Sequence, residues 1–241
     1  MKGLVNENNL LNIKHNGFTL AEVLITLGIV GVVAALTLPA VINNIKHKQL
    51  ETAFKKSYST LAQAVHSVYL TELGGEFPSE RISFFNALQT RYIKSAACTD
   101  AQYNCPTEVF PISNFSSTAS GTFIANNYKN YNGKSSTVGY CNDGIIATND
   151  GSFVFIDTSS SNQASAGMFF LCVDTNGWRK VPNRIGHDFF IFQLGSNGKL
   201  MPMGADGTFF TECSKTSNSA YNGFGCTEKA LYDKDYFKNL P

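Results

Sequence analysis

The sequence predicts an α+β fold in which a long N-terminal α-helix packs against a C-terminal antiparallel β-sheet with disulfide-bonded loops. Three observations predict this fold. An apolar segment, 18–42, passes into a stretch with helical periodicity that ends near residue 74. Two β-hairpin signals follow residue 144. All six cysteines lie in the C-terminal two-thirds of the 241-residue chain.

The composition favours an extracytoplasmic, loop-rich β domain over a cytosolic enzyme. Only 15% of residues are charged and the formal net charge is +1. Binding of duplex DNA depends on neutralising its phosphates, so a nucleic-acid partner is not expected. The sequence contains no G-x-S-x-G, P-loop or H-E-x-x-H motif, so we expect no enzymatic activity.

The cysteines predict disulfide bonds. They do not form a C-x-x-C pair, so zinc ligation by thiolates is not expected, and disulfides in an oxidising compartment are favoured. Six cysteines allow 15 connectivities. Proximity in the sequence favours two local loops and one bond that joins strands. These pairs are Cys98–Cys105, Cys213–Cys226 and Cys141–Cys172.

The N-terminus combines a short polar segment with a candidate transmembrane helix. Residues 1–17 are polar, and the apolar segment 18–42 contains a single charge, Glu22. About 20 helical residues span a bilayer core, so the apolar segment is long enough. A conventional signal peptide fits less well, because its apolar region of about 7–15 residues precedes a small-residue cleavage site. Here the small residue, Gly17, comes first.

Glu22 has two interpretations. Insertion of a carboxylate into a membrane costs about 2.5–3.5 kcal/mol, so a charged residue in such a segment indicates a function. In the first interpretation, Glu22 lies near the helix start and reaches the lipid headgroups. In the second, cleavage after Gly17 gives Phe18 a free amino group four residues before Glu22. Positions i and i+4 share a helix face, so the carboxylate can neutralise that ammonium, in its own chain or in a neighbour.

The hexapeptide Gly17-Phe18-Thr19-Leu20-Ala21-Glu22 resembles the prepilin cleavage and methylation motif. This motif belongs to the type IV pilins and to the pseudopilins of type II secretion systems. Four features coincide: a short polar leader, a glycine before the cut, a glutamate at the fifth mature position and an apolar helix. The resemblance covers about residues 16–45 and implies a pilin-like fold.

The resemblance also implies a pathway and its partners. A prepilin peptidase cuts between Gly17 and Phe18 and N-methylates Phe18. The subunit waits in the lipid of the inner (cytoplasmic) membrane as a single-pass protein, with its leader cytoplasmic and its C-terminal domain extracytoplasmic. A cytoplasmic assembly ATPase and an inner-membrane platform protein then drive it into a helical filament with other pilin or pseudopilin subunits, at the cell surface or in the periplasm. In that filament Glu22 matches the Phe18 amino group of an adjacent subunit.

Charge distribution conflicts with this orientation, because the lysines after the apolar segment outnumber the two that precede it. The positive-inside rule mildly favours the opposite topology. We retain a cytoplasmic leader, because the cysteines need an oxidising side and the motif requires it in this family.

The predicted helix continues beyond the membrane segment. Pro39 removes one backbone hydrogen bond, so we expect a kink there rather than a helix end, because periodicity resumes afterwards. The pair Gly74-Gly75 is the expected stop. The predicted organisation is a leader at 1–17, a transmembrane and assembly helix at 18–42, its amphipathic continuation at 43–74 and an extracytoplasmic globular domain at 75–241.

The C-terminal domain is predicted to contain a short helix and an antiparallel sheet of roughly four or five strands. The helix covers Arg81–Ile93 with Ser79 as N-cap, and 113–137 shows little regular pattern. The expected strands are Ile145–Thr148 and Ser152–Asp157 around Asn149-Asp150-Gly151, then Met168–Val173, then Phe189–Leu194 and Lys199–Met201 around Gly195-Ser196-Asn197-Gly198.

One loop offers candidate calcium ligands. Asp174 and Asn176 lie in a glycine-containing loop, with Asp188 downstream, and calcium prefers such oxygen ligands. The resemblance adds that some pseudopilins carry calcium in the loops of the sheet. The spacing does not match an EF-hand. The alternative is a structural turn in which Asx side chains cap backbone amides. Calcium is the one candidate cofactor.

The expected function is that of a structural subunit of a type IV pilus-like or type II secretion pseudopilus filament. The alternative is a minor or tip pilin whose sheet domain is an adhesion or DNA- and surface-binding module. Trp178 is interpreted as a core or subunit-contact residue, with an exposed aromatic platform for carbohydrate as the alternative.

Overall fold

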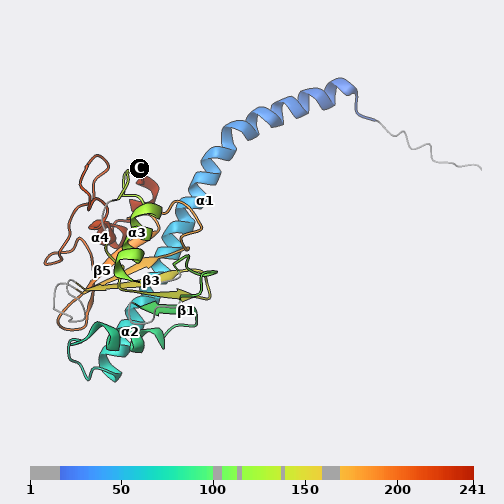
Figure 1. Cartoon of the computed structure of the whole chain (residues 1–241). Coiled ribbons are helices and arrows are strands. Elements are labelled where there is room, and N and C mark those ends of the chain that lie inside the picture. The colour runs from blue at the N-terminus through green and yellow to red at the C-terminus, as the bar shows by residue number, and fades with distance from the viewer. Residues whose placement is uncertain (1–16, 100–104, 113–115, 137–138, 159–168) are drawn as a thin grey trace, which may run out of the picture. The chain divides into compact units, whose positions relative to one another are not determined.

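The computed structural model describes residues 17–99, 105–112, 116–136, 139–158 and 169–241. It confirms the α+β class, with a long N-terminal helix and a C-terminal antiparallel sheet (Figure 1). The chain divides into two compact units, one that ends at Ile45 and one that comprises Lys46–Pro241. In chain order the elements are α1 (Leu20–Thr71), α2 (Arg81–Gln89), β1 (Lys94–Thr99), α3 (Ser117–Asn127), β2 (Gly144–Thr148), β3 (Phe153–Thr158), β4 (Phe169–Asp174), β5 (Phe189–Leu194), β6 (Leu200–Pro202), α4 (Cys226–Tyr232) and the 3₁₀-helix η1 (Tyr236–Asn239).

Helix α1 belongs to both units and follows the predicted helix within three residues at each end. In the second unit its apolar positions recur every three or four residues and are buried at Phe54, Leu61, Val65 and Val68. The helix stops at the Gly74-Gly75 pair, where φ is +59° and +87°. Glycine adopts this left-handed conformation without steric cost, so the pair ends the helix as predicted.

The sheet is a six-stranded antiparallel meander in the order β1-β2-β3-β4-β5-β6. The predicted strands correspond to β2–β6, with Met168 outside the described residues. The turn of the β2–β3 hairpin ends at Gly151, where φ is +87°. The sheet has one strand more than the upper estimate, because β1 forms at Lys94–Thr99, where no strand was predicted. Most residues of this strand, Lys-Ser-Ala-Ala-Cys-Thr, are small, and they lack apolar alternation, so the strand is evident only from its pairing with β2.

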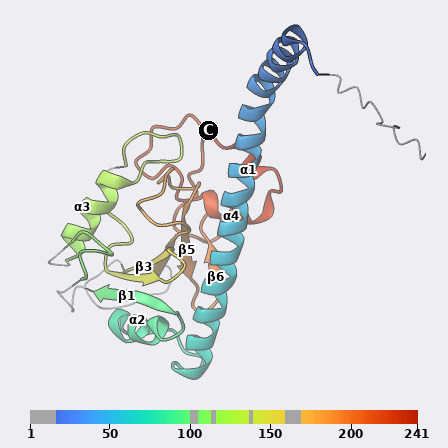
Figure 2. The ribbon, with the colours of Figure 1, turned by 90° about the vertical axis from the view of Figure 1, so that its right-hand side faces the viewer.

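Both faces of the sheet are covered. On one face, alternate strand residues such as Ile156, Leu171 and Phe192 join the buried residues of α1 and α2 in one hydrophobic core (Figure 2). On the other face, Phe155 and Cys172 join a second core with residues of α3 and the later loops. Successive strand residues point to opposite faces, so strands β2–β5 are buried throughout.

Three expectations for local structure were wrong. Helix α2 ends at Gln89 rather than Ile93, and its N-cap is Glu80 rather than Ser79, with no side-chain capping bond. Within 113–137, predicted to have little regular structure, the described residues form α3. The Ser116 hydroxyl caps this helix by accepting a hydrogen bond from the Ala119 N–H at 3.1 Å. Residues 113–115 and 137 lie outside the described part.

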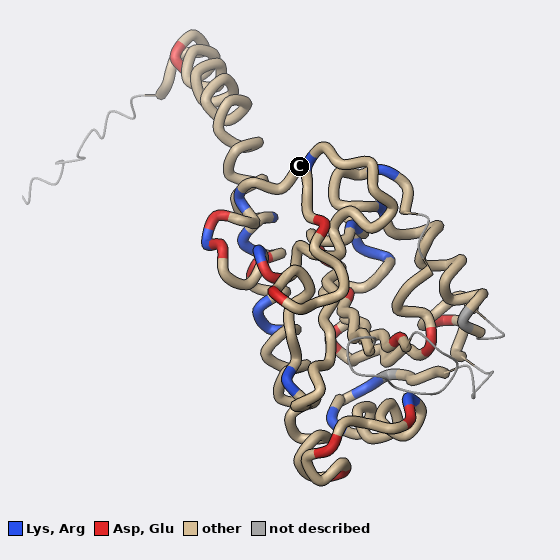
Figure 3. Tube along the Cα trace, turned by 90° about the vertical axis from the view of Figure 1, so that its left-hand side faces the viewer, with Lys and Arg blue, Asp and Glu red and all other residues tan. Residues whose placement is uncertain are grey.

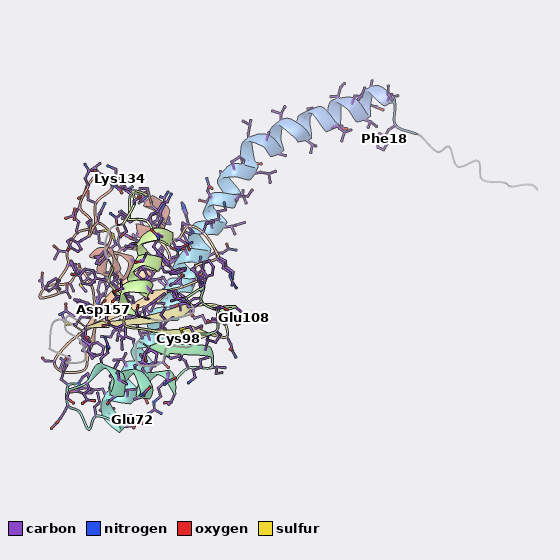
Figure 4. All side chains as sticks on the ribbon, in the orientation of Figure 1. Phe18, Glu72, Cys98, Glu108, Lys134 and Asp157 are labelled. Atoms are coloured by element: carbon purple, nitrogen blue, oxygen red, sulfur yellow. A yellow bond between two sulfur atoms is a disulfide. The ribbon has the colours of Figure 1, made fainter. Side chains whose placement is uncertain are left out.

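Three disulfides tie the second unit together. They join Cys98 to Cys105, Cys141 to Cys172 and Cys213 to Cys226, with Cα–Cα distances of 5.5, 6.0 and 4.9 Å. This is the combination that sequence proximity favoured. Cys141 precedes β2 rather than lying in a strand, so its disulfide ties a loop to the sheet at β4. Cys98, in β1, is labelled in Figure 4.

Candidate functional site

The candidate cleavage site lies just before α1. Phe18 is 87% exposed and α1 begins two residues later (Figure 4). A Cβ added to Gly17 would meet no atom within 4 Å. The described fold therefore places no steric demand for glycine at this position. A demand for glycine would come from another molecule that binds this segment, as a processing peptidase does.

Glu22 lies in the first turn of α1 and forms a reciprocal cap with Thr19. Its carboxylate Oε2 accepts hydrogen bonds from the Thr19 N–H and hydroxyl, each at 2.8 Å. The Thr19 hydroxyl in turn accepts from the Glu22 N–H at 3.2 Å. This is a capping box, which satisfies backbone donors at the start of a helix. The T-x-x-E spacing of Thr19 and Glu22 is a sequence signal for this cap, in addition to the two interpretations of Glu22 as a headgroup contact or a charge partner.

The described residues of the first unit form mostly an apolar helix whose side chains are exposed in the isolated chain. Val23, Ile29 and Leu36, for example, are 43%, 60% and 76% exposed. Among the described residues, α1 is the one helix long and apolar enough to cross a membrane, with a mean hydropathy of 2.4 in its most apolar window. Exposed apolar surface on this scale needs lipid or other helices to cover it. Pro39 lies inside α1, so the alternative in which it ends the helix is wrong.

A second candidate site lies between β4 and β5, where the fold brings two aspartates together. Asp174 ends β4 and Asp188 immediately precedes β5, and both are fully buried. Asp174 Oδ1 accepts from the N–H groups of Asn176 and Gly177 at 3.1 and 2.8 Å. Its Oδ2 accepts a hydrogen bond from the Tyr128 hydroxyl. These contacts include the Asx turn that the sequence offered as an alternative to metal binding.

Asp188 is held by the backbone of the same loop. Its two carboxylate oxygens accept from the N–H groups of Asn183 and Arg184 at 2.8 and 2.7 Å. Burial raises the pKa of Asp188, and the nearby charge of Asp174 raises it further. Burial likewise raises the pKa of Asp174. The loop therefore concentrates negative charge that this environment disfavours.

The same loop contains other buried side-chain oxygens besides those of the two aspartates. The side-chain oxygens Asn176 Oδ1, Asn183 Oδ1 and Thr175 Oγ1 are buried without a hydrogen-bond partner. Calcium takes six to eight oxygen ligands from carboxylates, amides and backbone carbonyls. No group of three or more His, Cys, Asp or Glu side chains is placed to hold a metal within the described segments. A site here would thus depend on amide, hydroxyl and backbone oxygens as well as the two carboxylates.

Trp178 is not an open aromatic platform. The Arg179 guanidinium lies over its ring, 4.8 Å from the centroid, and Phe123 meets it edge-on at 5.4 Å. The indole N–H donates to the Val109 carbonyl at 3.2 Å. These contacts assign Trp178 to packing between the β4–β5 loop and the segment before α3, and they occupy the ring that a sugar would need.

A third cluster was missed in the sequence. Arg81, at the start of α2, forms a buried ion pair with Asp143 at 2.6 Å. Asp157 in β3 lies beside them and accepts from the Cys141 N–H at 2.6 Å. Burial and the neighbouring Asp143 charge raise the pKa of Asp157 to about 7. These residues are far apart in the sequence, so no local pattern could predict the cluster. It ties α2 to the sheet next to the Cys141–Cys172 disulfide.

Comparison with known proteins identifies one segment. Residues 12–38 match the family model described as the prokaryotic N-terminal methylation motif. No curated protein and no solved structure matches the chain.

The matched segment contains the proposed cleavage point, Glu22 and most of the apolar helix. The match confirms the resemblance to type IV pilins and pseudopilins in this segment. The motif implies processing by a prepilin peptidase and assembly into pilin-type filaments, and its proteins are typically structural. Together with the long apolar N-terminal helix, it fits a membrane-anchored, single-pass protein. The chain therefore carries the prokaryotic N-terminal methylation motif at residues 12–38, and this motif supports a type IV pilin-like or pseudopilin-like precursor.

Proposed function

We propose that the chain is a structural subunit of a type IV pilus-like or type II secretion pseudopilus filament, cleaved after Gly17, N-methylated on Phe18 and assembled through α1. The observation that carries this proposal is the position of Glu22, the single charge in an apolar segment that matches the methylation motif. An unpaired carboxylate would disfavour membrane insertion and helix bundling. Cleavage after Gly17 would supply the missing positive charge four residues away.

The capping box sharpens the test of Glu22. Glutamine can cap Thr19 as glutamate does, but it cannot neutralise an ammonium group. If charge pairing is the role of Glu22, Glu22→Gln and Glu22→Val both abolish filaments. If capping is the role, Glu22→Gln assembles normally and only Glu22→Val fails. A control is Glu228→Gln, which also removes a carboxylate from the first turn of a helix, but from α4 rather than α1.

Processing is tested by mass spectrometry of the membrane-associated protein from its native host. We expect a mature chain that begins at Phe18 with one added methyl group. A chain that retains residues 1–17 in the presence of the peptidase would contradict the proposal. The filament fraction then separates a major subunit, which is abundant there, from a minor or tip subunit.

We further propose that the β4–β5 loop binds calcium through Asp174, Asn176 and Asp188. The buried carboxylate pair and the unpartnered Asn176 and Asn183 oxygens support this proposal. A bound calcium ion would supply positive charge to the pair. The residues themselves fix the loop, because Asp174 and Asp188 hold its backbone N–H groups at both ends.

Calcium binding is measured by thermal unfolding of the detergent-solubilised chain in EDTA and in millimolar calcium. Calcium at 100 times its dissociation constant stabilises the folded state by about 2.7 kcal/mol, which raises the unfolding temperature. Asp188→Asn removes this response, whereas Asp206→Asn, at an exposed position, retains it. Identical unfolding of the unaltered chain in EDTA and calcium would leave the Asx turn as the sole role of the loop.

A further inference from the structure

One face of α1 in the second unit is not covered by the rest of that unit (Figure 2). Residues on this face recur every three or four positions and are all exposed, as expected for one side of a helix. We name this face the outer stripe. It consists of Lys48, Thr52, Lys55, Ser59, Gln63, His66 and Leu70.

The outer stripe is poor in charge over most of its length. Between Lys56 and Glu72 the helix contains no Asp, Glu, Lys or Arg. An exposed helix face normally carries such residues, which also form stabilising i,i+4 pairs. Depletion of charge is instead typical of the centre of a protein–protein interface. Leu70, at the end of the stripe, is 55% exposed.

The threonines of this region present less polarity than the sequence indicates. The Thr52 hydroxyl donates to the Lys48 carbonyl at 2.8 Å, and the Thr71 hydroxyl donates to the Ser67 carbonyl at 2.9 Å. With the hydroxyls bonded to the helix backbone, the methyl groups remain available for contact. The cleft of about 370 Å³ beside α1 is a separate feature, because its lining includes the charged Lys56, Arg91 and Asp150 and no residue of the stripe. The stripe itself is thus weakly polar.

Opposite charges lie at the two ends of this region (Figure 3). Lys48 and Lys55 mark its beginning, where both remain exposed although each pairs with Glu51 of its own chain. The turn after α1 carries the exposed Glu76 and Glu80. Neither glutamate forms an ion pair with the described residues of its own chain. A parallel copy displaced by about 24 Å or more along the helix would bring the lysine end of one chain to the glutamate end of the next. Such a head-to-tail contact is heterologous and propagates into a filament.

We propose that the outer stripe is a contact surface for a second copy of this chain, with its lysine end facing the Glu76–Glu80 turn of the neighbour. This inference rests on the proposed filament function and names a surface outside the methylation motif. The partner is the same chain, because both charged ends lie on one molecule. A displaced copy brings its exposed lysines to Glu76 and Glu80, which have no ion pair among the described residues.

The first test places a photo-crosslinking amino acid at Gln63 in the full-length protein in its native host. We expect a crosslinked species of twice the subunit mass in the filament fraction, with mass spectrometry identifying the same chain as partner and peptides from the Glu76–Glu80 region in the adduct. The same probe at Lys215, an exposed loop position, serves as control. Crosslinks to a different protein, or none above the Lys215 control, would overturn the proposal.

The second test uses isosteric charge changes. Gln63→Glu places a charge at the centre of the stripe, and glutamate has a helix propensity similar to that of glutamine. We expect about a tenfold or larger fall in the filament fraction, because an unpaired charge at an interface core is strongly unfavourable. Asn86→Asp, a matched change at an exposed position on α2, leaves assembly unchanged. Equal assembly of the two variants would contradict the proposal.

Charge exchange tests the orientation. Glu76→Lys lowers assembly by like-charge repulsion, and adding Lys55→Glu restores it at least in part. Lack of restoration in the double variant would refute the head-to-tail arrangement. Failure of this inference is distinguishable from failure of the filament function. If only this inference fails, the unaltered chain and the stripe variants all form filaments. If the filament function fails, the unaltered chain forms none.

Discussion

The buried carboxyl group of Asp157 makes stability depend on pH near neutrality. Asp157 is 5% exposed in β3, next to the Arg81–Asp143 ion pair. Burial is the larger cause that raises its pKa from 3.8 to about 7, and the Asp143 charge is the second. Such a shift corresponds to roughly 4 kcal/mol between the two protonation states.

The sign of the effect follows from proton binding. Between pH 4 and 7 the folded state retains a proton on Asp157 that the unfolded state has released, so stability falls as the pH rises. The loss is complete above pH 7. Between pH 5 and 8 this group alone lowers the free energy of unfolding by about 2.5 kcal/mol.

The perturbation is Asp157→Asn, which removes the titration while keeping an oxygen that can accept from the Cys141 N–H. Urea unfolding of the detergent-solubilised chain, followed by fluorescence of the single tryptophan, Trp178, gives the free energy of unfolding at each pH. We compare the variant with the unaltered chain rather than either alone. His187, whose pKa burial lowers to about 4, titrates in both proteins and with the opposite sign.

We expect the stability of the variant relative to the unaltered chain to rise by about 2.5 kcal/mol from pH 5 to pH 8. Asp206→Asn, at an exposed position, serves as the control and leaves the pH dependence unchanged. A relative stability that stays constant across this range would show that Asp157 is charged in the fold at pH 5. The reasoning from burial would then fail.

Three further predictions concern the packing of the second unit, each measured by the same urea titration. Phe54→Ala lowers the free energy of unfolding by about 3–5 kcal/mol, because its ring is buried in the core between α1 and the sheet; a loss below 1 kcal/mol would contradict this packing. Replacing Cys141 and Cys172 with serine costs about 3.7 kcal/mol for a sequence separation of 31, and equal stability of the oxidised chain and the variant would refute the estimate. Gly198→Ala destabilises by more than about 1 kcal/mol, because φ is +71° and an added Cβ would lie 2.1 Å from the Tyr69 ring; an unchanged midpoint would show that the turn relaxes freely.

The sequence by itself determined the features that depend on neighbouring residues. The apolar segment, the continuing helical period and Gly74-Gly75 predicted α1 almost to the residue. Glycine-containing turns between apolar runs predicted five of the six strands. The methylation motif is likewise a local pattern, because a peptidase reads a short segment of chain, and residues 12–38 match it. Each of these signals comes from residues that are close to one another in the sequence.

Only the tertiary structure decided the features that depend on residues distant in the sequence. Strand β1 forms because it pairs with β2, and its small side chains give no period of their own. Asp174 and Asp188 were grouped from the sequence as candidate calcium ligands, but only the pairing of β4 with β5 shows that both are buried at the ends of one loop.

The buried Arg81–Asp143–Asp157 cluster and the uncovered outer stripe have the same origin. A residue's burial is set by which elements fold over it, and helical periodicity shows that α1 has an outer face without showing that nothing covers it. Local sequence therefore predicted the methylation motif and the apolar helix that contains most of it. Long-range packing decided where its domain holds buried charge and which surface is left for a partner, because those contacts join residues that no local pattern relates.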